Sequence, residues 1–137
     1  MRAERRREGC LGRAMFRFER LLVWHKAIAL YDSIDALCET LVEHSQYVLA
    51  DQLRRAALSV SSNIAEGAGR DSPKDSRHFY TMARGSLFEV VSVAALCNRR
   101  KSIADEQYAA LYAAADEISK MLTALKGVHR PQRPTNS

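Results

Sequence analysis

The chain has 137 residues, of which 47% are hydrophobic, and a formal net charge of +5 at neutral pH. This length is typical of one domain with a core of its own. No apolar run approaches the ~20 residues that cross a bilayer, and the arginine-bearing start lacks the apolar stretch of a secretory signal, so we expect a cytoplasmic protein with no membrane contact.

Apolar residues recur at helical spacing in four segments, and no strand-like alternation persists. The spacing predicts a first helix from about Glu19 to Glu43 and a second from about Tyr47 to Ala68. A third begins after Ser72, a suitable N-cap, and continues to about residue 98. A fourth is expected after Ser102 as its cap and ends near Gly127.

Four helices of similar length with short connections predict an all-α fold, an antiparallel up-down four-helix bundle over residues 16–127. Residues 1–15 are expected to be a mobile Arg-rich arm and residues 128–137 a mobile tail, and Met15 could be the natural start. The predicted core contains the following residues: Trp24, Leu53, Val60, Ile64, Phe79, Leu87, Val90 and Leu122.

Positive charge concentrates at the two ends and in the middle of the chain. Residues 1–14 carry +3 and residues 129–137 carry +2, so the part between them sums to zero. Within that part, residues 52–101 have nine basic and four acidic side chains, which makes the second and third helices the basic side. The candidate residues for binding nucleic acid or a partner are Arg54, Arg55, Arg77, Arg84, Arg99, Arg100 and Lys101.

The stretch SSNIAEGAGR, residues 61–70, places a polar stripe beside the apolar face of the second helix. Gly67 lies near the middle of the apolar face, where a missing side chain would let a neighbouring helix approach closely. Glu66 precedes Arg70 by four residues, the order in which an ion pair stabilises a helix. Asn63, at the edge of the core, would need partners from another helix or another chain.

The runs LLVWHKAIAL, LRRAALSVSSNIAEGAGR and FYTMARGSLFE resemble a bacterial four-helix-bundle family encoded in intervening sequences of large-subunit 23S ribosomal RNA genes. The resemblance covers roughly residues 16–126. It implies a ring-like homopentamer without established catalytic activity. It also implies a distant relationship to the accessory protein of diversity-generating retroelements, which binds reverse transcriptase and nucleic acid.

Catalytic residues are hard to find in the chain. The three cysteines form no C-x-x-C pair, and Cys38 and Cys97 fall on apolar helix faces, where small buried hydrophobes are expected. The four histidines are scattered, and the spacing of Asp75 and His78 is more typical of a surface contact than of a metal site. We therefore expect a non-enzymatic protein without metal or cofactor, and a metal- or ligand-binding bundle enzyme is the weaker alternative.

The third helix carries more apolar surface than one core can use. Phe88 and Val91 fall on a second stripe, with Arg77 and Arg84, about 100° to 140° around the helix from the core-facing stripe. Apolar residues exposed in this way are typical of an interface. The sequence favours a homo-oligomeric scaffold that binds RNA, DNA or a partner protein through its basic surface, and a reverse-transcriptase accessory protein is the alternative.

Overall fold

The computed structural model describes residues 16–128. The predicted arm at residues 1–15 and residues 129–137 of the predicted tail lie outside that range, whereas Val128, the first residue of the predicted tail, is the last residue of a helix. A short 3-10 helix, η1 (Arg17–Arg20), is followed by four long helices. These are α2 (Leu22–Glu43), α3 (Tyr47–Ala68), α4 (Pro73–Arg99) and α5 (Asp105–Val128). No strand occurs between residues 16 and 128, as the spacing predicted.

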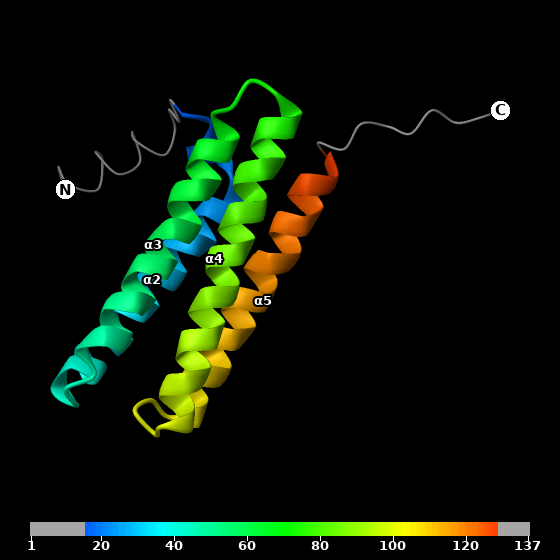
Figure 1. The fold of residues 1–137 in the computed structure, drawn as a ribbon. Helices are drawn as coiled ribbons and strands as arrows, with labels where there is room; N and C mark the ends of the chain where they lie inside the picture. The colour runs from blue at the N-terminus through cyan, green and yellow to red at the C-terminus, as the bar shows by residue number, and fades with distance from the viewer. Residues whose placement is uncertain (1–15, 129–137) are drawn as a thin grey trace, which may run out of the picture.

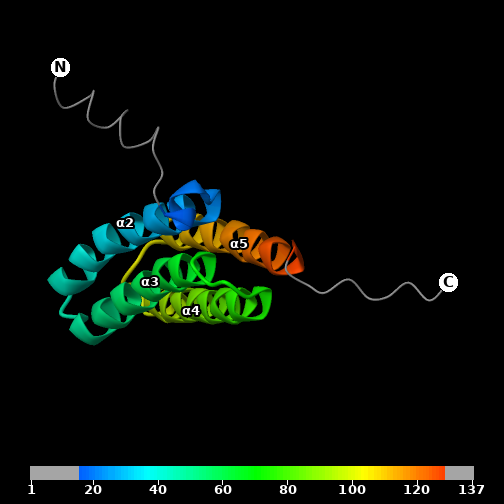
Figure 2. The ribbon, with the colours of Figure 1, turned by 90° about the horizontal axis from the view of Figure 1, so that it is seen from above.

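The helices form two layers. Figure 2 shows α2 and α5 in one layer and α3 and α4 in the other. The turns between consecutive helices lie alternately at the two ends of the molecule (Figure 1). Each helix packs against two others, because α2 contacts α3 and α5 while α4 contacts the same two helices from the other side. None of the helices in the described part is long and apolar enough to cross a membrane.

The core lies between the two layers and contains most of the predicted residues. Two predictions are wrong, because Trp24 and Phe79 are only partly buried, whereas Tyr80 is 2% exposed and is the largest fully buried side chain. Trp24 packs on the edge of the core and against the ring of Phe18, whose centroid is 4.8 Å away. The six correct predictions are Leu53, Val60, Ile64, Leu87, Val90 and Leu122.

The predicted start of the third helix is confirmed, and that of the fourth is wrong. The Ser72 hydroxyl accepts a hydrogen bond from the backbone N–H of Asp75 at 3.1 Å, and Pro73 follows it as the first helical residue. Ser102 does not cap α5, which begins at Asp105. Its backbone N–H instead donates to the carbonyl of Cys97 at 2.9 Å and closes the end of α4.

Candidate interaction surfaces

The polar stripe of α3 is satisfied mainly within its own helix. The side-chain amide of Asn63 donates to the carbonyl oxygen of Ser59 at 2.9 Å and to its hydroxyl at 3.0 Å, both within α3. The expected partner from another subunit stays a prediction. Ser59 makes the contact between helices instead, because its hydroxyl lies 2.8 Å from that of Ser86 on α4. The predicted ion pair of Glu66 and Arg70 is present at 3.0 Å.

Gly67 is a point of close contact between α3 and α4. A Cβ atom at this position would lie 2.6 Å from Cε1 of Tyr80, closer than real side chains come. The ring of the neighbouring Phe79 lies under the guanidinium group of Arg70, with Cζ 4.3 Å from the ring centroid. The glycine therefore makes room for a buried tyrosine, which explains why the helix tolerates its cost in stability.

The outer face of α4 and α5 carries an apolar groove of about 290 Å³. Phe88 is 54% exposed and Tyr112 on α5 is 53% exposed, and both line the groove with the partly buried Val91. Arg84 spans the two helices, because its Nε donates to the Ser119 hydroxyl at 3.3 Å while its Cζ lies 5.1 Å from the Phe88 ring centroid. Phe88 and Val91 of α4 therefore line this groove together with residues of α5.

Arg77, on the same stripe of α4, has a buried Nε atom with no hydrogen-bond partner in the part of the chain described. An unsatisfied buried N–H of a charged group is costly, and native structures contain few of them. An acceptor brought by another molecule would remove this cost.

The remaining candidate bases divide into two groups. Arg54 and Arg55 form ion pairs, with Asp35 on α2 at 2.8 Å and with Asp51 on α3 at 2.9 Å respectively. Arg99, Arg100 and Lys101 are exposed together where α4 ends, and no ion pair holds them among the described residues. The cluster at residues 99–101 is therefore the part of the predicted basic surface most available to a ligand.

Cys38 and Cys97 are buried, as predicted for small hydrophobes. Burial raises the pKa of the Cys38 thiol to about 11, although the charge of Arg54 opposes the shift. Burial also raises the pKa of Cys97. Such thiols stay protonated near neutral pH and are poor nucleophiles and metal ligands. Residues 16–128 contain no group of three or more potential metal-ligating side chains.

Sequence reasoning missed the residues that complete these surfaces from other helices. Ser86 and Ser119 are small polar residues inside helices, and Tyr112 lies on a segment of alanines that offers no separate motif. Its position in the sequence could have identified Ser86 as a residue at the edge of the core. Ser86 lies next to Leu87 and about one helical turn after Ala83, and both of these residues are on the buried face of α4. Only the packing of the helices shows that its hydrogen-bond partner is Ser59.

The arrangement defines an all-α protein of four long helices whose outer faces carry a basic cluster and an apolar groove. The chain belongs to the family described as 23S rRNA-intervening sequence protein, whose profile matches residues 19–124. It is similar to a crystal structure of a protein of unknown function from the S23 ribosomal protein family of Bacteroides thetaiotaomicron. That likeness has a TM-score of 0.74 at 26% identity and covers 77% of this chain and 98% of the other. No protein with a curated description matches significantly.

Proposed function

We propose that this protein is a non-enzymatic, oligomeric scaffold built on an antiparallel up-down bundle, which binds nucleic acid or a partner protein through its basic surface. The observation that carries the proposal is the groove of α4 and α5, where Phe88 and Tyr112 each expose more than half of their side-chain surface. Two exposed aromatic rings lining one apolar groove are typical of a protein interface. A homopentamer is the form that the family resemblance implies.

Arg77 and Arg84 lie on the edge of this interface. Assembly in a ring would repeat them around the symmetry axis and would concentrate positive charge there. The buried Nε of Arg77 would then face an acceptor from the neighbouring subunit or from a bound anion. The cluster Arg99, Arg100 and Lys101 would add a second basic area to each subunit.

Light scattering on the purified protein tests the assembly. The wild type should be an oligomer and Phe88→Glu a folded monomer, because burying an unpaired carboxylate in an interface is strongly unfavourable. Val48→Glu is the matched control, since Val48 is 76% exposed in the first turn of α3, away from the groove, and this variant should assemble normally. A monomeric wild type, or Phe88→Glu assembling like the control, would contradict the interface.

Binding of a labelled single-stranded RNA, followed at several salt concentrations, tests the nucleic-acid part of the proposal. A variant with Arg99, Arg100 and Lys101 replaced by Gln should bind the RNA more weakly. A plot of the logarithm of the binding constant against the logarithm of the salt concentration should become less steep, by about 0.7 for each phosphate group that the variant no longer neutralises. Lys120→Gln is the control, because Lys120 forms an ion pair with Asp116 on α5. Equal affinity and slope in all three proteins would leave an acidic partner protein as the ligand of this surface.

A further inference from the structure

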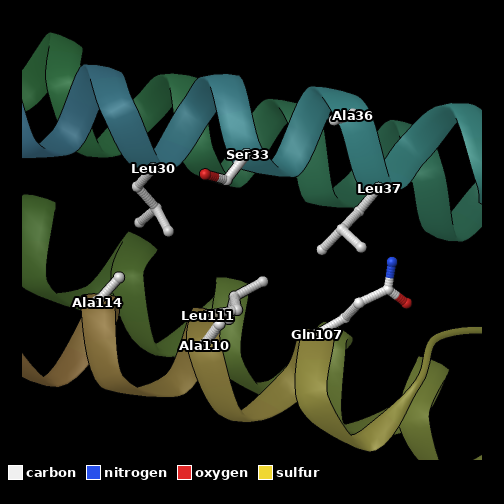
Figure 3. A pocket seen from close by; sticks show the side chains of 8 residues that line it. All are labelled: Leu30, Ser33, Ala36, Leu37, Gln107, Ala110, Leu111 and Ala114. Atoms are coloured by element: carbon white, nitrogen blue, oxygen red, sulfur yellow. The ribbon is translucent and has the colours of Figure 1, made fainter.

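Residues of α2 and α5 line a second apolar hollow of about 300 Å³. These two helices form one layer of the molecule, and α3 and α4 form the other (Figure 2). Its floor consists of the buried side chains of Leu30 and Leu37 from α2 and Leu111 from α5. Figure 3 shows these leucines pointing into the space between the two helices. The walls are small or polar, namely Ser33, Ala36, Gln107, Ala110 and Ala114.

The hollow exists because the side chains above the leucines are short. Ser33, Ala36 and Ala110 are exposed and cannot close over the leucines below them. An ion pair between Lys26 of α2 and Glu117 of α5, at 2.9 Å, also joins these two helices. The leucines below these short side chains belong to the core, and the hollow, which we call the trough, lies above them.

The trough has an acidic rim. Asp32 and Glu39 lie four residues before and three residues after Ala36, and Glu106 lies four residues before Ala110, so helical spacing places each carboxylate next to a wall residue. All three are exposed and have no ion-pair partner among residues 16–128. Lys26 on α2 forms an ion pair with Glu117, and Lys120 in the middle of α5 forms one with Asp116, so neither lysine is free to pair with the rim.

We propose that this trough is a docking site for a basic amphipathic helix of a partner protein. The apolar floor requires an apolar stripe on the partner, and the carboxylates on both sides require Lys or Arg on both flanks of that stripe. Leu30 and Leu37 are seven residues apart, which is about 10.5 Å along α2. The partner helix therefore presents apolar anchors at positions i, i+3 or i+4, and i+7.

This site is separate from the basic surface and from the α4–α5 groove, and it takes a ligand of the opposite charge. It therefore does not depend on the scaffold's self-assembly or on nucleic-acid binding. A protein with both surfaces could hold an acidic and a basic ligand at once, one on each layer.

Fluorescence anisotropy with a labelled helical peptide of about four turns tests the proposal. The probe carries Leu at i, i+4 and i+7 with Lys on both flanks of this stripe. One comparison peptide has Glu in place of Lys, and another has the same composition with the leucines scattered around the helix. The probe should bind at least tenfold more tightly than either comparison peptide, and its affinity should fall with salt.

Variants of the protein locate the site. Ala110→Trp should fill the trough and weaken binding of the probe at least tenfold. If this variant fails to fold, Ser33→Trp, on the opposite wall, should have the same effect. Asp32→Asn combined with Glu39→Gln should weaken binding severalfold and flatten its salt dependence. Glu89→Gln is the control, because Glu89 is an exposed carboxylate on α4, in the other layer, and its removal should leave binding unchanged.

Three results would overturn the proposal. Equal binding of the probe and the scattered-leucine peptide would show that charge alone attracts it. Unchanged binding to a folded Ala110→Trp or Ser33→Trp variant would place the peptide elsewhere. A wild-type oligomer that dissociates on substitution of Ala110 by Trp, as measured by light scattering, would show that a second copy of this chain occupies the trough.

Discussion

Gly67 leaves a gap on the buried face of α3, and the ring of Tyr80 from α4 fills it. The pairing of a missing side chain with a large one sets how closely the two helices approach. It also explains why Tyr80 rather than its neighbour Phe79 lies in the core, since the ring that reaches Gly67 is excluded from solvent while Phe79 covers the edge under Arg70.

Replacing Gly67 by Ala should destabilise the protein. Overpacking a tight contact costs about 1–3 kcal/mol, which exceeds what alanine gains as a helix former. Gly85→Ala is the matched control on α4, where a Cβ atom would meet nothing within 4 Å, and it should stabilise the protein by about 0.5–1 kcal/mol. Urea denaturation measures both, and a Gly67→Ala variant as stable as Gly85→Ala would refute the contact with Tyr80.

The buried thiols predict a loss of stability at alkaline pH. The pKa of Cys38 rises from 9.0 to about 11 on folding, so between these values the folded protein keeps a proton that the unfolded chain releases. The contribution of Cys38 to the free energy of unfolding should therefore be constant well below pH 9 and fall as the pH rises toward 11. Urea denaturation of Cys38→Ala should show a shallower decline, and an equal decline in both proteins would assign the effect to other groups, such as the buried Tyr80.

At the scale of the helices, the two turns at one end of the molecule are built alike. Ser45 and Lys101 both have a positive φ of 60°, and each follows the last turn of a helix. The backbone N–H of Gln46 donates to Leu41 at 2.8 Å, just as that of Ser102 donates to Cys97. These are Schellman-type ends, in which glycine is the usual residue, and the absence of glycine hid them from sequence reasoning.

Removing the Ser72 hydroxyl should weaken the start of α4. Ser72→Ala loses the hydrogen bond to the Asp75 N–H and should destabilise the protein by about 1 kcal/mol. Ser102→Ala is the control, because only the backbone of Ser102 takes part in the turn, and its melting temperature should stay within experimental error of the wild type. A larger loss of stability in Ser102→Ala than in Ser72→Ala would support the original prediction that Ser102 is an N-cap.

At the scale of the whole molecule, one apolar core between two layers carries the stability, and the ion pairs on the surface contribute little. Ile34 and Leu122 are fully buried, whereas the side chains of the ion pair Lys26 and Glu117 are 34% and 56% exposed. Exposed ion pairs gain at most about 1 kcal/mol. The layers are therefore held together mainly by packing.

Two substitutions compare these contributions. Leu122→Ala should reduce the free energy of unfolding by about 2–5 kcal/mol, because it removes buried methyl groups and leaves a cavity. Lys26→Met should change it by less than about 1 kcal/mol, although it breaks the ion pair across the seam of α2 and α5. Chemical denaturation measures both, and a larger loss from Lys26→Met than from Leu122→Ala would mean that the seam depends on charge.

The sequence by itself determined the helical class, the bounds of α3, the Ser72 cap, the Glu66–Arg70 ion pair and the family, because each depends on residues close together in the chain or on a continuous motif. Local spacing also identified Gly67 as a packing position and Phe88 as an exposed aromatic residue.

Only the tertiary structure decided what these residues meet. Periodicity places a residue on a face to within about one position, which is too coarse to choose between Phe79 and Tyr80 or between Ser102 and Asp105. The hydrogen bond between Ser59 and Ser86, the groove that Phe88 and Tyr112 both line, and the trough of α2 and α5 arise from the relative rotation and spacing of helices far apart in sequence. That geometry is set by the packing of the whole core, because each side chain must fill the space that its neighbours leave.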